Sequence, residues 1–113
     1  MAKVYVIQET RYDFTGAEEF GAVVFLSNAG KDDFNNVHPS EHNDRMVSHI
    51  KQKLRDYDPE HDWIVITGSP YICATVFSLL GLMGVWRLNM LRWDNRDFRY
   101  LPLIVDLPRS LNF

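Results

Sequence analysis

The chain has 113 residues, 46% hydrophobic and 24% charged, as in ordinary globular proteins, so we expect a single domain over residues 1–113 and exclude a disordered chain. One cysteine, Cys73, excludes an intrachain disulfide scaffold. The net charge of −3 is uneven: residues 1–62 carry seven Lys/Arg and twelve Asp/Glu, residues 63–84 carry none, and residues 85–113 carry five Arg and three Asp. Such asymmetry is typical of an interaction face.

The first half of the chain predicts two strands and one amphipathic helix. Residues 3–10 are apolar on both faces, which favours an interior strand. Residues 21–27 are apolar throughout and predict a second strand, after a polar connection. A long loop, residues 28–39, leads to a helix that has Ser40 as N-cap, carries one apolar stripe and runs to about Tyr57.

The uncharged stretch 63–86 predicts a strand and a helix, not a membrane span. Residues 63–67 are β-branched and aromatic, which favours a strand. Ser69 then offers an N-cap and Pro70 a first helical residue, so the chain turns a corner there. The helix that follows ends at about Met83, which makes it shorter than the roughly 20 residues that a bilayer requires. Because it is apolar nearly all round, we expect it to be buried on most sides.

The remaining residues predict a β-hairpin. Apolar and polar residues alternate from Trp86 to Met90, residues 94–97 supply a turn, and residues 98–107 return. Pro102 lacks a backbone donor, which predicts an edge strand or a bulge. The predicted fold class is α/β (α+β): one small domain with a mixed sheet of about five strands and two helices, in the order β-β-α-β-α-β-β.

A first candidate site is the turn Thr67-Gly68-Ser69. A strand that ends in small residues before a helix points N–H groups and the positive end of the helix dipole outward, and phosphates bind such places. However, the chain has no GxGxxG or GxxxxGK[ST] motif, and Pro70 removes one donor. A capped strand-to-helix junction without a ligand is therefore the competing interpretation.

Residues 38–42, His-Pro-Ser-Glu-His, match the H-x-x-E-H pattern of some zinc hydrolases. That chemistry needs both histidines on one face of a helix, whereas Pro39 places His38 before the helix. Cys73 has apolar neighbours and no nearby His, which predicts a buried structural thiol. We therefore expect no metal, no cofactor and no catalytic residue.

The predicted hairpin is the second candidate site. Arginine with tryptophan and tyrosine dominates the binding energy of many protein interfaces, and it also suits single-stranded nucleic acid. The acidic balance of the chain argues against nucleic acid, because that affinity comes mainly from neutralising phosphates. The competing interpretation is a solvated sheet face whose tryptophans complete the core. The candidate residues are Arg87, Arg92, Trp93, Arg96, Arg99 and Tyr100.

Three stretches carry a resemblance to a known family. The chain opens with KVYVIQE after Met1-Ala2, residues 63–70 end in Gly-Ser-Pro, and residues 88–94 and 99–103 contain Trp-Asp and Tyr-x-Pro. In this pattern the chain resembles a family of small proteins of tailed bacteriophages, of the marine phage type. The resemblance implies a viral accessory protein in the cytoplasm of an infected cell, and it carries over no activity and no site residue.

These observations predict a non-enzymatic module that binds a host or viral protein through the hairpin. One alternative is a nucleotide- or phosphate-binding protein that uses the turn at residues 67–69, and a weaker one is a single-stranded nucleic-acid binder. Self-association is also open, because the apolar and aromatic content is large for so short a chain. The N-terminus lacks the long apolar region of a signal peptide, which predicts a cytoplasmic protein without membrane contact.

Overall fold

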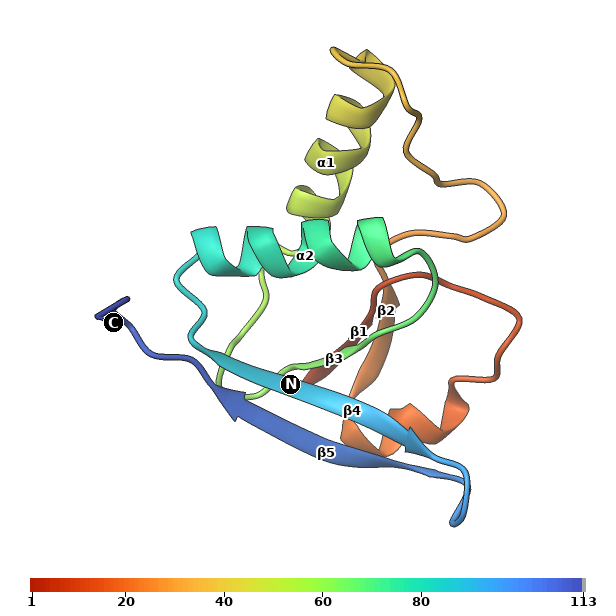
Figure 1. Ribbon diagram of the computed structural model, residues 1–113. Helices are drawn as coiled ribbons and strands as arrows, with labels where there is room; N and C mark the ends of the chain where they lie inside the picture. The colour runs from red at the N-terminus through yellow and green to blue at the C-terminus, as the bar shows by residue number, and fades with distance from the viewer. Residues whose placement is uncertain (113) are drawn as a thin grey trace.

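The protein folds as a five-stranded mixed sheet with two helices on one face and a 3₁₀ helix on the other (Figure 1). The structure, a computed structural model, describes residues 1–112. Its elements confirm the predicted fold class and chain order. They are β1 (Lys3–Val6), η1 (Thr15–Phe20), β2 (Ala22–Phe25), α1 (Glu41–Lys53), β3 (Trp63–Val65), α2 (Pro70–Leu82), β4 (Arg87–Asp94) and β5 (Arg99–Asp106).

The strand order in the sheet is β2-β1-β3-β4-β5. The first four strands are parallel to their neighbours, and β5 is antiparallel to β4. Parallel neighbours need crossover connections, which η1, α1 and α2 provide, whereas a tight turn suffices between β4 and β5. The interior position predicted for the first strand and the edge position predicted for the last are both confirmed.

The hydrophobic core has two layers, because alternate residues of each strand point to opposite faces of the sheet. On the helix side the buried residues are Tyr5, Ile7, Leu26, Met46, Ile50, Leu54, Tyr57, Ile64, Ile72, Val76, Leu80 and Val85. On the other side they are Val4, Val6, Phe14, Ala17, Val65, Leu91 and Tyr100. The connection expected to be merely polar thus supplies Phe14 and Ala17 to the second layer and contains η1.

Helix α1 begins where the sequence predicts and ends earlier. The hydroxyl of Ser40 accepts a hydrogen bond from Asn43 N (3.2 Å), as an N-cap does. At the other end Tyr57 N donates to Leu54 O (2.9 Å), a tighter turn that replaces the last predicted turn of helix. Tyr57 nevertheless stays buried and packs edge-on against Tyr5, with ring centroids 5.5 Å apart.

Helix α2 has the predicted start but not the predicted burial. Ser69 caps it and Pro70 is its first residue. Its end is fixed by Gly84, which has a φ of 80° and whose N–H donates to Gly81 O (3.0 Å). The expectation of burial on most sides is wrong: the side chain of Leu82 is 86% exposed, because α2 is an outer layer that covers the sheet with one face only (Figure 1). No helix within residues 1–112 is long and apolar enough to cross a bilayer.

Pro102 is placed so that it weakens no sheet bond. Leu107 N donates to Trp86 O (2.7 Å), and the regular register then makes Leu91 and Pro102 a pair without mutual hydrogen bonds. The backbone nitrogen of Pro102 therefore faces the open edge of β5, where no neighbouring strand needs an N–H donor. This is the position in which a sheet tolerates proline, and it discourages strand pairing at that edge.

Tyr57 generates a stability prediction. Its hydroxyl is the one buried side-chain N or O atom in residues 1–112 without a hydrogen-bond partner. Burial, followed by the charge of Asp62, raises the pKa of Tyr57 from 10.0 to about 12. We expect Tyr57→Phe to raise the free energy of unfolding at neutral pH by about 1 kcal/mol, because it removes an unsatisfied buried hydroxyl.

The same substitution alters the response to alkali. Above the ordinary pKa of tyrosine the unfolded chain loses the Tyr57 proton before the folded chain does, so the wild type loses stability as the pH rises from 10.0 toward about 12. The Tyr57→Phe variant should lose less of its free energy of unfolding over that pH range, because it has no proton to release at this position. Urea unfolding at neutral pH and in that alkaline range measures both effects. A variant less stable than the wild type at neutral pH would contradict the account.

Candidate functional site

A cleft of about 750 Å³ opens at the carboxyl end of the parallel strands, between the β4–β5 hairpin and the segment that leads into η1. We call it the hairpin cleft. Ligands of α/β sheets commonly bind at this end of the strands. The residues that line it are 12–16, 65–67, 90–93, Phe98, Tyr100 and Leu103.

The cleft exists because β3 is shorter than the hairpin beside it. β3 pairs with β4 only as far as Leu91, whereas the β4–β5 ladder continues to Asp94 and Arg99. After Val65 the chain leaves the sheet toward the start of α2. The last residues of β4 consequently have no strand beside them on that side.

The backbone of Trp93 faces the side that β3 has left. Leu107 N donates to Trp86 O just before β4 begins, so Leu88, Met90, Arg92 and Asp94 are the residues of β4 that bond β5. The alternate residues, including Leu91 and Trp93, turn their N–H and C=O toward β3. Leu91 meets β3 there, and Trp93 lies beyond its end. The cleft thus combines apolar side chains with a main-chain donor and acceptor.

Aromatic rings form one wall of the cleft. Trp93 and Tyr100 pack edge to face, with ring centroids 5.0 Å apart and an interplanar angle of 68°. A Cβ on Gly16 would lie 3.7 Å from the Tyr100 ring and 3.9 Å from the Trp93 ring, so the first turn of η1 packs directly on this pair. Burial, and secondarily the charge of Asp13, raises the pKa of Tyr100. Tyr100 is therefore neutral at physiological pH, and the wall is largely apolar.

Two apolar side chains of the cleft remain open to solvent. Ile66 is 53% exposed and Phe98 is 75% exposed. Phe98 also has a φ of 50°, a left-handed conformation that is strained for a bulky residue. Strain of this kind costs about 1 kcal/mol or more and is concentrated at binding and switch sites. An exposed ring held in that conformation makes the cleft a candidate binding surface.

The structure brings three of the six predicted hairpin residues into the cleft: Arg92, Trp93 and Tyr100. Arg87 lies at the opposite end of β4, roughly 17 Å away along the strand, where its Nε lies 2.7 Å from Asp106 Oδ1.

Of the other two predicted hairpin residues, Arg96 lies in the turn between β4 and β5, and Arg99 is the first residue of β5. Arg96 N donates to Asp94 Oδ1 (3.0 Å), and the exposed guanidinium of Arg99 lies 3.7 Å from the carboxylate of Asp97. The turn therefore alternates positive and negative side chains instead of presenting a positive patch.

The turn predicted to bind an anion has the amide of Ser69 engaged within the protein. Ser69 N donates to Gln8 Oε1 (2.8 Å). The hydroxyl of Ser69 accepts hydrogen bonds from Tyr71 N (3.2 Å) and Ile72 N (3.5 Å). Of the residues predicted for this site, only Thr67 lines the hairpin cleft. Anion binding at this turn stays a prediction, and a ligand there would have to displace the Gln8 carboxamide.

The remaining reactive side chains do not assemble into a centre. His38 precedes α1, and His42 Nε2 lies 2.6 Å from Asp33 O. Residues 1–112 contain no group of three or more His, Cys, Asp or Glu side chains that could hold a metal ion. Cys73 Sγ donates to Thr67 O (3.6 Å), and burial raises the pKa of its thiol, which disfavours the reactive thiolate.

The sequence did not identify several residues of the cleft: those at 12–16, Ile66 and Phe98. Residues 11–20 are mostly polar, so they read as a connection, although Tyr12 and Phe14 stand out in it. Phe98 directly follows a turn-forming run, at a position where glycine or asparagine is expected. A bulky aromatic residue at that position was the one sign in the sequence that Phe98 is unusual. The sequence predicts Ile66 to continue the buried strand that begins at Trp63.

Comparison with known proteins places the chain among phage proteins. A family model described as Phage Pam3 gp32-like protein matches residues 2–107, which include every helix and strand and the whole hairpin cleft. No curated protein and no solved structure matches the chain. The family match confirms the resemblance to bacteriophage proteins seen in the sequence.

The junction below the cleft yields a prediction from a matched pair of glycines. Gly68 has a φ of 81°, and a Cβ there would lie 2.0 Å from Gln8 Oε1. We expect Gly68→Ala to lower the free energy of unfolding by at least about 2 kcal/mol, through backbone strain and loss of the Gln8 hydrogen bond. Gly81 lies inside α2 with open space where a Cβ would stand, so Gly81→Ala should raise the free energy of unfolding by about 0.5–1 kcal/mol. Urea unfolding of both variants tests this, and equal effects would refute the role of the Gly68 corner.

Proposed function

This chain belongs to the phage Pam3 gp32-like family, and we propose that it is a phage accessory protein that binds an extended, apolar segment of a host or viral protein in the hairpin cleft. The protein works as a binding module without catalysis, in the cytoplasm of the infected cell. The observation that carries the proposal is the cleft itself, where Phe98 and Ile66 are exposed beside the free backbone of Trp93.

The composition of the cleft favours a protein segment as the ligand. Tryptophan, tyrosine and arginine contribute most to protein interfaces, and Trp93, Tyr100 and Arg92 lie together here. An extended segment can also use the main chain of a strand, as in β-strand addition, and Trp93 offers one donor and one acceptor. A cleft of about 750 Å³ has room for one or two large apolar side chains of such a segment.

The charges of this region support a protein over a nucleic acid. Asp13 and Arg92 both line the cleft, so its charged groups nearly balance. Asp94 and Asp97 lie among the arginines of the adjoining turn. A polyphosphate chain gains affinity by meeting uncompensated positive charge, and little is present here.

Affinity capture from phage-infected cells tests the proposal. We expect Trp93→Ala and Phe98→Gly to weaken recovery of the partner by roughly thirtyfold, the equivalent of about 2 kcal/mol for a central interface residue. Phe98→Gly is the decisive variant. It removes the exposed ring and relieves the left-handed strain, so the protein should remain folded and at least as stable.

A second tryptophan, directly before the same strand, provides the control. Trp86 is 38% exposed, close to the 42% of Trp93, but it lies outside the cleft. Trp86→Ala should leave recovery of the partner unchanged. Equal recovery with the wild type, Trp93→Ala and Phe98→Gly would rule out the hairpin cleft as the binding site.

A further inference from the structure

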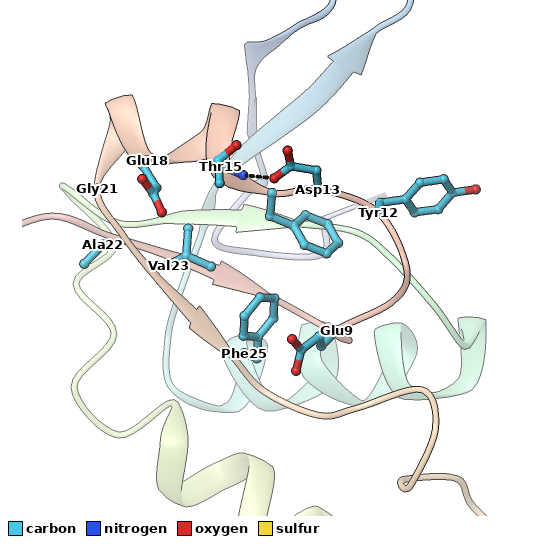
Figure 2. A pocket seen from close by; sticks show the side chains of 10 residues that line it. Glu9, Tyr12, Asp13, Thr15, Glu18, Gly21, Ala22, Val23 and Phe25 are labelled. Carbon is cyan, nitrogen blue, oxygen red and sulfur yellow. Dashed lines mark hydrogen bonds between the residues drawn. The ribbon is translucent and has the colours of Figure 1, made fainter.

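A second groove, of about 660 Å³, lies along β2 at the other edge of the sheet (Figure 2). We call it the β2 groove. Residues 12–15 line both this groove and the hairpin cleft, so they form the ridge between the two. Phe14, Val23 and Phe25 give the groove an apolar floor, and Phe14 packs edge-on against Phe25 with ring centroids 5.7 Å apart.

The edge of β2 offers an unpaired backbone to this groove. Ala22 N and Leu26 N donate to carbonyl oxygens of residues 2 and 6, so the even-numbered residues of β2 bond β1. In a parallel pair the intervening residues, Val23 and Phe25, turn their N–H and C=O to the open side. An open strand edge is a template for pairing with a further extended segment.

The charge of the β2 groove selects the kind of segment. Glu9, Asp13 and Glu18 line it, Figure 2 shows their carboxylates around the apolar floor, and no Lys or Arg is among the lining residues. None of the three carboxylates forms an ion pair within the described part of the chain. Lysine and arginine can lay their alkyl stems on an apolar surface while their charged ends reach such carboxylates.

One lysine of the chain already binds at this edge. Lys53 Nζ, from the end of α1, donates to Phe25 O (2.9 Å), one of the outward carbonyls of β2. A cation at this edge is thus compatible with the fold, and the N–H and C=O of Val23 remain for a partner. Lys53 takes one backbone acceptor and leaves the three carboxylates without a cation.

We infer that the β2 groove binds an extended, lysine- or arginine-rich segment of a partner protein, which pairs with the edge of β2 and sets its cationic side chains on Glu9, Asp13 and Glu18. This surface is distinct from the hairpin cleft and does not depend on the function proposed for it. An acidic groove on one side of the ridge and an apolar cleft on the other would let the protein hold two segments of different chemistry.

Fluorescence anisotropy with labelled peptides tests the inference on the full-length protein. The probe is a peptide of about eight residues that alternates lysine and valine, long enough to pair with a short strand, and its counterpart carries glutamate in place of lysine. We expect only the lysine peptide to bind. Glu18→Lys should weaken its binding on the order of tenfold, because it reverses a charge inside the groove.

The matched control is the neighbouring residue. Glu19 is exposed, belongs to the same η1 and does not line the groove, so Glu19→Lys makes the same change in net charge and should leave binding nearly unchanged. Equal loss in both variants would mean attraction to net charge alone and would overturn the inference.

A proline variant tests the backbone pairing. Val23→Pro removes an N–H that faces the open edge while sparing the bonds between β1 and β2, so the sheet should tolerate it. Binding of the lysine peptide should be lost in this variant with little change in melting temperature. Unchanged binding would overturn the strand-addition part of the inference. If Val23→Pro does not fold, the comparison of Glu18→Lys with Glu19→Lys still decides.

Discussion

The hydrogen bond between Ser69 N and the carboxamide of Gln8 fixes the corner on which the rest of the structure depends. Gln8 is 3% exposed, and its side chain also donates to Asp32 O (3.0 Å), so the long loop is tied to the same point. The Thr67 hydroxyl donates to Gln8 O (2.5 Å), which joins the ends of β1 and β3. Only a residue without a side chain fits at Gly68, against the carboxamide. The buried carboxamide of Gln8 thereby has partners for both its nitrogen and its oxygen, as burial requires.

This corner has opposite consequences for the two sites considered from the sequence. The N–H of Ser69 is the donor that a phosphate would have used, and at this corner it donates to a neutral amide instead. It also ends β3 early, since the chain must turn away from the sheet to begin α2 at Pro70. The hairpin continues past that point, and the gap left beside Trp93 is the hairpin cleft. One local constraint thus occupies a donor of the predicted anion site and leaves the space that becomes the hairpin cleft.

The sequence predicted the local features of the fold and missed those that depend on how elements meet. The caps at Ser40 and Ser69 and the edge position forced by Pro102 follow from residue chemistry within a few positions, and all three are confirmed. The partial exposure of α2 was not predictable, because composition reveals apolarity but not how many layers cover it. The hairpin cleft could not be predicted from the sequence either. It arises from the unequal lengths of β3 and β4, and the alternation of apolar and polar residues along one strand does not reveal the length of its neighbour.

The candidate site residues were also predicted only in part. Arg92, Trp93 and Tyr100 were found from their residue types, and the cross-strand register places Trp93 opposite Tyr100. Arg87 shares their chemistry but lies at the far end of β4, so composition alone grouped residues that the fold separates. The acidic side chains of the β2 groove, at positions 9, 13 and 18, lie close together in sequence, but their spacing matches no motif.

Amide hydrogen exchange at Ser69, followed by NMR, tests the central corner most directly. If the Gln8 carboxamide holds this amide, Ser69 should exchange as slowly as the amides of β1 in the wild type and much faster in Gln8→Ala. A Ser69 amide that exchanges in the wild type as quickly as in an unstructured peptide would contradict the account, because the turn would then be open.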